Sequence, residues 1–484
     1  MDQQKSIKGI TALLGPQAAL YTDLYQLTMA QGFFLSGKAA IPAVYDYTFR
    51  ENPYQGGYVM FAGIGDVLEV LAQFRFDEEA LRYLRGLKFR EEFLQYLQQF
   101  HFHGTVSAMR EGEIVFPGEP LVRVEGNLIE SQLIETMLLN VLNFESLIAT
   151  KASRIRFAAG NRKITDFGLR RAQGFGGILA SKAAMIGGVD STSNVFAGYH
   201  FGLDVSGTQA HSWIQSFNDE LTAFRRFAEL YPDNCVLLVD TYGTLKSGIP
   251  HAIIVARELE AKGKRLAGVR LDSGDLASLS KKVRAMLDAA GLRYVQIVAS
   301  NQLDEYLIYT LTQQNAPIDA YGVGTKLVSA HGSAALEGIY KISELNGQPS
   351  MKVTDNFLKT TMPGKKHVFR FFDDKGMFDC DGVLLVNEQQ IESLYHPAFI
   401  GHQRNVGKLP VQPLLTKMME QGKLAVSIPS VQESERYASN RFVLLPMDYK
   451  RFEKPLQYKV GFCTPIMNLR TELYKRLQQI PVAR

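Results

Sequence analysis

The sequence predicts an α/β protein with a barrel-type core, and two patterns support this. Between residues 164 and 327, seven apolar runs end in Gly, Asp, Ser, Thr, Asn or Arg, and a helix-like stretch follows each run. Apolar strands that alternate with helices are typical of parallel βα units. Polar and basic residues gather just after the strands, where barrel loops open on one face and form active sites, so the pattern predicts an enzyme. The predicted strand ends are 164–171, 186–194, 203–213, 236–244, 267–275, 296–305 and 319–328.

The segments before this core are expected to mix helix and strand. Helical spacing predicts a helix over 20–34, with Thr22 or Asp23 as its N-cap. It also predicts one long amphipathic helix over 130–159 that leads into the core. The segments expected to contain strands are 43–53, 56–74, which turns into a helix, and 101–126, a small sheet or sandwich.

After the core, strands return from residue 341 onward, with short turns at 346–348 and 373–376. The tetrapeptide Asp379-Cys380-Asp381-Gly382 resembles the start of a calcium loop but lacks the rest, so we expect a hairpin turn there. The predicted regions are 1–150 (N-terminal, α+β), 151–340 (α/β barrel catalytic domain) and 341–484 (C-terminal, β-rich or irregular).

Composition narrows the functional classes. A chain of 484 residues that is 46% hydrophobic can bury a large core and should hold two or more domains. Its 53 basic residues are interleaved with 49 acidic ones, so no nucleic-acid partner is predicted. No apolar stretch approaches the ~18 residues that span a bilayer, and the N-terminus lacks the layout of a signal peptide. The three cysteines form no metal-binding pattern, which indicates reduced structural thiols in a cytoplasmic protein.

The last strand end, Tyr321-Gly322-Val323-Gly324-Thr325-Lys326, is a candidate phosphate site. Two glycines allow the backbone to approach a ligand, and consecutive N–H groups can hold an anion. Phosphate sites favour the last strands of such barrels. A tight turn without a ligand is the alternative explanation.

A second candidate is the strand end that carries Arg270, Asp272 and Asp275. Arginine offers a planar fork for a carboxylate or phosphate. The two acids could bind ribose hydroxyls or a Mg²⁺ ion that carries pyrophosphate. The alternative is a helix N-cap and an ordinary ion pair, which we expect for one of the two aspartates.

Three further strand ends carry groups suited to catalysis or binding. His211 follows a glycine turn and could act as an acid, a base or a phosphoryl acceptor. Arg170 suits a polyanion, and Phe167 could stack on a flat ring or pack in the core. Ser300-Asn301 and Asp240-Thr241 complete the ring of strand ends.

These motifs together resemble the nicotinate phosphoribosyltransferase family over nearly the whole chain. The motifs that carry the resemblance, in order, are TDLYQ (22–26), DFGLRRAQ (166–173), GGVDSTSN (187–194), GTQAHS (207–212), VDTYGT (239–244), RLDSGDL (270–276), ASNQLDE (299–305) and GVGTK (322–326). The resemblance implies conversion of nicotinate and phosphoribosyl pyrophosphate (PRPP) to nicotinate mononucleotide and pyrophosphate, coupled to ATP hydrolysis, in NAD biosynthesis. It also implies Mg²⁺ as cofactor, an irregular (β/α) barrel, an accessory α+β domain built from the N- and C-terminal regions, and a homodimer with shared active sites.

The resemblance further implies a role for each site residue. His211 would be phosphorylated transiently by ATP, while Tyr25 of the partner subunit and Phe167 would sandwich the pyridine ring. Arg270 and Thr208 would recognise the nicotinate carboxylate. The remaining expected site residues are Gly322, Gly324 and Thr325 for the 5-phosphate, Arg170, Asp272 and Asp275 for the ribose and Mg²⁺-pyrophosphate, Ser300 and Asn301 for PRPP, and Asp190 as a less specific candidate.

Three other functions remain open at this stage. A nicotinamide phosphoribosyltransferase shares the outline but differs around GTQAHS. A non-catalytic ligand sensor on the same scaffold would be expected to lose His211, Arg270 or the GVGT loop, and this chain keeps all of them. An aldolase-like lyase needs a lysine at a strand end in an apolar setting, and only Lys326 is near, where a phosphate contact suits it better.

Overall fold

The computed structural model describes residues 11–353, 361–388, 391–397 and 401–478, and the chain divides into two compact units. The continuous unit holds Lys151–His331, and the two-segment unit combines Met1–Thr150 with Gly332–Arg484. Among the described helices, none combines the length and apolar character needed to cross a membrane.

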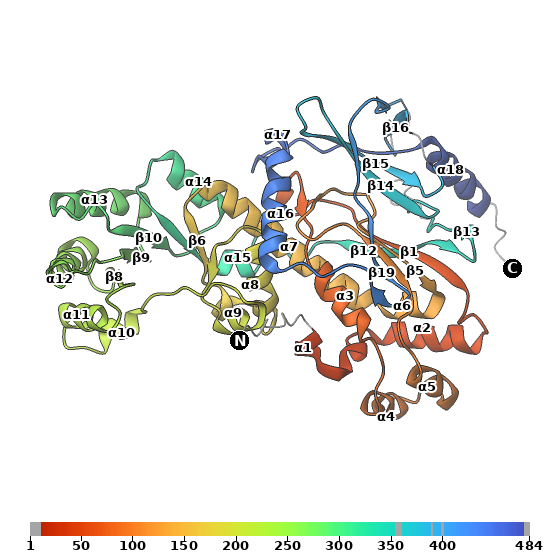
Figure 1. Cartoon of the computed structure of the whole chain (residues 1–484), viewed down its shortest axis with the longest axis horizontal. Coiled ribbons are helices and arrows are strands. Elements are labelled where there is room, and N and C mark those ends of the chain that lie inside the picture. Colours follow the sequence, from red (N-terminus) through yellow and green to blue (C-terminus); the bar gives the residue numbers. More distant parts are fainter. Residues whose placement is uncertain (1–10, 354–360, 389–390, 398–400, 479–484) are drawn as a thin grey trace. The chain divides into compact units, whose positions relative to one another are not determined.

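Six parallel strands form the sheet of the continuous unit, in the order β7-β6-β11-β10-β9-β8. Helices connect strands that follow one another in sequence, as parallel pairing requires, and α11, α12 and α13 flank β8, β9 and β10 (Figure 1). The strands are Lys163–Asp166 (β6), Ser191–Thr192 (β7), Val236–Leu238 (β8), Gly268–Leu271 (β9), Gln296–Ser300 (β10) and Ala320–Val323 (β11). The helices are Gly176–Ile186 (α8), Val195–Phe201 (α9), His211–Gln215 (α10), Glu220–Leu230 (α11), Ile249–Ala261 (α12), Leu276–Ala289 (α13), Glu305–Gln313 (α14) and Thr325–Val328 (α15).

This sheet is open in its hydrogen bonding. The last strand, β11, pairs with the first, β6, as a barrel requires. The predicted strand over 203–213, however, is reduced to one parallel bridge between Thr192 and Val205, and in the described residues β8 is left at the sheet edge. Polar residues and a glycine surround Val205, whose side chain is exposed, so this segment buries too little to hold a strand. The mixed α/β class is confirmed, and barrel closure stays a prediction.

Strands from both ends of the chain form the largest sheet of the two-segment unit. Its order is β13-β12-β1-β5-β3-β19-β20, with antiparallel pairs throughout, so β1 lies between β12 and β5. A second sheet, β17-β16-β21-β15-β14-β18, is antiparallel except for β15–β21, and β2 pairs with β4. The strands are Pro42–Phe49 (β1), Val59–Met60 (β2), Thr105–Ala108 (β3), Ile114–Val115 (β4), Val122–Asn127 (β5), Gly338–Leu345 (β12), Gln348–Pro349 (β13), Lys366–Phe372 (β14), Phe378–Leu385 (β15), Ser393–Tyr395 (β16), Gln403–Asn405 (β17), Val411–Pro413 (β18), Thr416–Glu420 (β19), Lys423–Leu424 (β20) and Val460–Phe462 (β21).

The helix predicted over 20–34 is present as Leu24–Leu35, whereas the helices found within 78–98 and 431–478 were not predicted, and one predicted helix is corrected. The predicted helix over 130–159 is two helices, α6 and α7, interrupted at Ile134. The apolar periodicity continues through Ile134, which is why the sequence gives no sign of the break. The helices are Thr11–Leu14 (α1), Leu24–Leu35 (α2), Ile64–Ala72 (α3), Glu78–Gly86 (α4), Glu91–Gln98 (α5), Leu128–Leu133 (α6), Glu135–Ala159 (α7, which continues into the continuous unit), Val431–Leu444 (α16), Met447–Lys450 (α17) and Thr464–Gln478 (α18).

A buried ion cluster links the two segments of this unit. The guanidinium of Arg370, on β14, donates to Asp381 at 2.8 and 2.6 Å and to Glu113 at 2.6 Å. Arg441, on α16, donates to the same Glu113 at 2.8 Å. Asp381 therefore lies inside strand β15, and the hairpin turn predicted at 379–382 is wrong, because this ion pair buries the acidic position within the strand. The turn predicted at 373–376 is present between β14 and β15.

The cysteines are structural. Cys235, Cys380 and Cys463 are buried and form no disulfide. Burial raises the pKa of the Cys235 thiol to about 12, which keeps it protonated and unreactive near neutral pH.

Candidate active site

Arg270 is the centre of the polar cluster at the strand ends of the continuous unit. It lies on the fully buried strand β9, and its own side chain is 9% exposed. Its Nη1 donates to Thr208 Oγ1 at 3.0 Å, its Nε donates to Ser300 Oγ at 2.9 Å, and its Nη2 lies 3.0 Å from Asp272 Oδ2. The structure thus brings together residues from three separate motifs.

Strand register explains why these residues meet. Leu271 on β9 pairs with Ala299 on β10, so the residues that follow them, Asp272 and Ser300, become neighbours. Ser300 in turn pairs with Gly322 on β11. Carboxyl ends of parallel strands lie along one edge, and the motifs gather there for that reason.

The Phe167 ring forms the apolar wall of the cluster. The guanidinium carbon of Arg270 lies 5.2 Å from the centre of this ring, within cation–π range. The Asp166 carboxylate holds the loop that carries Phe167 by accepting hydrogen bonds from the Gly168 amide and from the hydroxyls of Ser181 and Thr192. Burial raises the pKa of the Asp166 carboxyl, and these three donors oppose that effect. Phe167 is half-buried, so one part of the ring packs and another remains exposed.

Gly322 is required by this wall. A Cβ atom at this position would lie 2.3 Å from the Phe167 ring. The glycine therefore makes room for Phe167, whereas the sequence suggested that it makes room for a ligand. A Cβ atom at Gly324 would be less crowded than one at Gly322. Gly324 precedes Thr325, which begins the short helix α15.

Lys326 is held by an acid of the neighbouring strand end. Its Nζ lies 2.6 Å from Asp304 Oδ2, so the predicted phosphate contact by Lys326 competes with an existing ion pair. Asp304 also caps helix α14 by accepting from the Leu307 amide. This arrangement ties the GVGTK loop to the next helix and stabilises both.

His211 begins helix α10 and is partly exposed. Its Nδ1 lies 3.0 Å from Thr241 Oγ1, and its Nε2 lies 3.8 Å from Asp272 Oδ2. The ring is thus oriented by Thr241, and its Nε2 remains accessible beside an acidic group. The GTQAHS motif itself contains no carboxylate, and the fold brings Asp272 close to His211 from a distant part of the chain.

The two predicted aspartates have different environments. Asp275 is the N-cap of α13 and accepts from the amides of Ala277 and Ser278, which is the structural role expected for one of the pair. Asp272 faces Arg270 and Ser300 instead. Asp240 is a third acid that the sequence placed among the strand ends without a role. Its Oδ2 accepts from the Asp272 amide and the Ser273 hydroxyl, and its buried Oδ1 has no hydrogen-bond partner among the described residues.

Two further predicted residues lie at the rim. Arg170 is exposed on the short 3₁₀ turn Leu169–Arg171. Asn301 is exposed with φ of 86°, a left-handed conformation that asparagine tolerates better than most residues. Asp190, the less specific candidate, forms an ion pair with Arg156 and accepts from the Ile164 amide, which identifies a structural role.

Comparisons with known proteins agree with this arrangement. The nicotinate phosphoribosyltransferase N-terminal domain model matches residues 20–143, the family model matches 162–387, and the C-terminal domain model matches 365–470. The nicotinate phosphoribosyltransferase of Bacillus subtilis (strain 168) is 41% identical over 455 residues, which cover 91% of this chain and 92% of that protein. This chain belongs to the nicotinate phosphoribosyltransferase family.

Solved structures of related proteins share its fold. The crystal structure of human nicotinic acid phosphoribosyltransferase matches with a TM-score of 0.83 and 32% identity, over 93% of this chain and 99% of that one. A nicotinate-nucleotide pyrophosphorylase from Pyrococcus furiosus matches with a TM-score of 0.70 and 25% identity, over 91% and 98% of the two chains. The predicted resemblance to the nicotinate phosphoribosyltransferase family is confirmed.

Tyr25 is the one predicted site residue of this family member that lies in the two-segment unit. Its place in a helix-like stretch, taken alone, predicts a core position for this aromatic side chain; that prediction is wrong, because Tyr25 is on helix α2 and is 48% exposed. Neighbouring polar contacts hold the start of α2: Asp23 accepts from the Thr136 hydroxyl at 3.0 Å, and Gln26 donates to Glu135 at 3.1 Å. The predicted side-chain cap by Asp23 is absent, because its carboxylate is bonded to Thr136.

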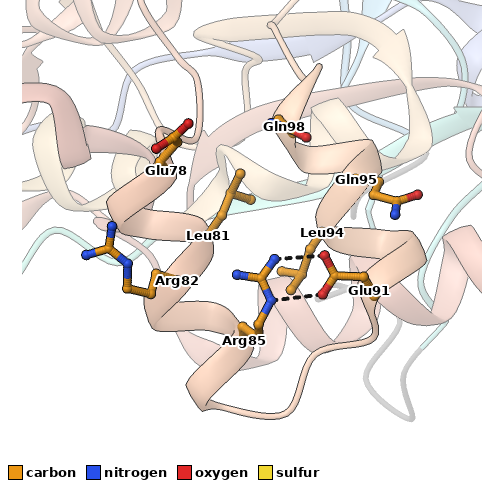
Figure 2. A pocket seen from close by; sticks show the side chains of 8 residues that line it. All are labelled: Glu78, Leu81, Arg82, Arg85, Glu91, Leu94, Gln95 and Gln98. Atoms are coloured by element: carbon orange, nitrogen blue, oxygen red, sulfur yellow. Dashed lines mark hydrogen bonds and ion pairs between the residues drawn. The ribbon is translucent and has the colours of Figure 1, made fainter.

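A shallow groove of about 250 Å³ lies between helices α4 and α5 of the two-segment unit. Figure 2 shows Arg85 and Glu91 forming a two-armed ion pair across it, beside Leu81 and Leu94. The two hydrogen bonds of this pair are 2.9 and 2.7 Å long. None of the predicted site residues lines it. Its exposed polar walls indicate a solvated helix pair.

Proposed function

We propose that this protein is a nicotinate phosphoribosyltransferase that joins nicotinate to PRPP with loss of pyrophosphate. The observation that carries the proposal is the Arg270 guanidinium, which lies beside the Thr208 hydroxyl and against the Phe167 ring. A planar cation next to an aromatic face suits a flat ring that bears a carboxylate. Nicotinate has both features, whereas nicotinamide lacks the charge.

The reaction needs alignment more than acid–base catalysis. The pyridine nitrogen already carries a lone pair, which forms the new bond to the ribose anomeric carbon while the carbon–oxygen bond to pyrophosphate breaks. Positive charge develops on the ribose, and the leaving group takes both electrons of the broken bond. Orientation of the ring and stabilisation of the leaving anion are therefore the main demands on the protein. This supports a site rich in anion-binding groups.

Mg²⁺ fits this site through its acids. Asp240 Oδ1 is buried without a partner among the described residues, and the Asp272 backbone amide lies 2.9 Å from Asp240 Oδ2. Asp240 would supply this oxygen to the ion. Asp272 would first have to exchange its contacts with Ser300 and Arg270, and Asp275 those with the start of α13. When bound, Mg²⁺ would neutralise pyrophosphate charge; it usually takes its other ligands from phosphates and water.

ATP coupling is assigned to His211. Its Nδ1 is engaged by Thr241, which leaves Nε2 as the nitrogen that would accept a phosphoryl group. The phosphohistidine would add negative charge near Asp272 and alter the relative affinity for PRPP and product. Gly324 and Thr325, with the Arg170 and Asn301 side chains at the rim, are proposed to bind the phosphates of PRPP.

Turnover assays test this proposal. Purified protein is incubated with nicotinate, PRPP and Mg²⁺, with and without ATP, and nicotinate mononucleotide is quantified by chromatography. Nicotinamide replaces nicotinate in a parallel reaction. We expect product from nicotinate and strong discrimination against the amide, because a site built to pair with a charged group rejects the analogue that lacks it. Preference for nicotinamide would assign the second candidate activity, and inactivity with both bases would favour a ligand sensor.

Replacement of His211 by alanine is expected to keep some synthesis of nicotinate mononucleotide and to abolish its stimulation by ATP. The physical reason is that His211 Nε2 is the accessible nucleophile beside the acidic cluster. The measurement is ADP release alongside product formation. ADP that still forms in step with product in this variant would exclude the phosphohistidine role.

We also propose that the protein acts in the cytoplasm as a homodimer with shared active sites and a closed barrel. Tyr25 of one copy would stack on the pyridine ring bound by the other. Its exposure on α2 supports this proposal, since an aromatic side chain held at a fixed position in solvent is available to a partner.

Subunit mixing tests the shared site. Tyr25→Ala and Arg270→Ala should each be strongly impaired alone. A mixed dimer rebuilds one intact site and one doubly defective site, so we expect recovery of up to about half the activity per mixed dimer. Subunit exchange is verified by native mass spectrometry of differently tagged chains. Verified exchange without recovery would place Tyr25 outside the partner's site.

A further inference from the structure

Ser300 lies between the two charged groups that dominate the site. It is 2% exposed at the end of strand β10. Its hydroxyl oxygen accepts from Arg270 Nε at 2.9 Å, and its proton is donated to Asp272 Oδ1 at 2.5 Å. Both functions of the hydroxyl are used, so Ser300 is poorly placed for the phosphate contact that the sequence predicted.

The hydroxyl interrupts a contact that Arg270 and Asp272 would otherwise make. A guanidinium and a carboxylate favour a two-armed pair, in which two N–H groups meet two oxygens. Here only one arm is formed, between Nη2 and Oδ2 at 3.0 Å. Ser300 Oγ occupies the second arm, between Nε and Oδ1. It thereby holds the carboxylate in a one-armed contact.

Counting donors shows what this achieves. A guanidinium has five N–H groups. Three of them are directed to Ser300, Thr208 and Asp272. One N–H on Nη1 and one on Nη2 have no hydrogen-bond partner among the described residues, and they belong to a guanidinium whose plane is held by all three partners. Two such donors match the two oxygens of a carboxylate ligand.

We infer that Ser300 is a positioning residue that determines carboxylate specificity by preventing Asp272 from pairing with Arg270 through two arms. The inference rests on the proposed function, since it concerns how Arg270 is presented to nicotinate. Without the hydroxyl, Arg270 can rotate to close the second arm with Asp272. The guanidinium then presents its remaining N–H groups in a different direction, and the substrate carboxylate competes with an internal one.

The test compares Ser300→Ala with the wild type in steady-state assays of nicotinate, nicotinamide and PRPP. We expect KM for nicotinate to rise about tenfold, and the ratio of kcat/KM for nicotinate over nicotinamide to fall about tenfold, the size of effect expected for one charge-assisted hydrogen bond. KM for PRPP should change less than about twofold. A rise in KM for PRPP with unchanged base discrimination would overturn the inference and restore the phosphate contact.

A double-mutant comparison separates positioning from general loosening. Lysine has no Nε–H equivalent to the one that Ser300 accepts, so Ser300→Ala should reduce discrimination by less than about twofold in an Arg270→Lys background. A further tenfold loss there would overturn the inference. Ser280→Ala is the matched control, because Ser280 is fully buried on α13 and its hydroxyl, within the described part of the chain, bonds only the Ala277 carbonyl. It should leave discrimination unchanged.

The proposed function and this inference fail in different ways. Absence of nicotinate turnover in the wild type contradicts the function and removes the basis of the inference. Turnover by the wild type with unaltered discrimination in Ser300→Ala contradicts the inference alone.

Discussion

Replacing Arg270 by alanine is expected to lower kcat/KM for nicotinate by about 30- to 1000-fold, which corresponds to roughly 2–4 kcal/mol of lost transition-state stabilisation. The side chain is 9% exposed, so the charged contact is made in a site largely shielded from water. Removal also leaves Asp272 without the cation at 3.0 Å from its Oδ2. The expected result is therefore a loss larger than that of a single neutral hydrogen bond.

Lysine at the same position isolates geometry from charge. Arg270→Lys keeps a positive charge but replaces the planar fork with a compact ammonium group. We expect it to raise KM for nicotinate and to narrow the preference over nicotinamide. Circular dichroism and thermal melting of both variants serve as the folding control. Unchanged discrimination between the two bases in both variants would move carboxylate recognition to another residue.

Local sequence patterns predicted where the parallel strands end, but they did not predict which segments pair to complete the sheet. Apolar runs ending in polar residues identified β6, β8, β9, β10 and β11, because a buried parallel strand must be apolar and must end where the chain returns to solvent. The segment around Val205 stands where the next strand of the series is expected, but it has too few apolar residues to form more than one β-bridge. Pairings such as β1 with β12 join residues about 300 apart, and no local pattern encodes them.

The site shows a similar limit. The strand-end pattern identified Arg270, Asp272 and His211 as candidates, since parallel strands bring their carboxyl ends together, and the family resemblance added Thr208. The sequence did not show which of the two aspartates caps a helix and which faces the site. In the structure, the Asp275 carboxylate turns toward α13 and the Asp272 carboxylate turns toward Arg270. The sequence also did not show that the Ser300 hydroxyl lies between Arg270 and Asp272, since that depends on the register between β9 and β10.

The second large effect that we expect is on stability, and it follows from the burial of Arg370. Arg370→Ala is expected to lower the free energy of unfolding by about 3–5 kcal/mol, because it leaves the buried Asp381 without its cation, while Glu113 keeps only its contact with Arg441. Arg370 is fully buried, and its guanidinium carbon also lies 4.2 Å from the Phe378 ring centre.

Arg404→Ala is the matched control for that prediction. Arg404, on β17, makes a two-armed ion pair with Asp379, which lies two residues from Asp381 on the same strand β15. Its side chain, however, is 48% exposed. Water solvates the Arg404 guanidinium in both the folded and the unfolded state, whereas the Asp379 side chain is 12% exposed when folded. Removal of Arg404 should therefore cost about 1 kcal/mol, well below the loss for Arg370→Ala. The free energy of unfolding of both variants is measured by urea titration followed by far-UV circular dichroism. Equal destabilisation of the two variants would contradict this prediction. It would mean that the buried cluster around Arg370 contributes no more to stability than the Arg404–Asp379 ion pair.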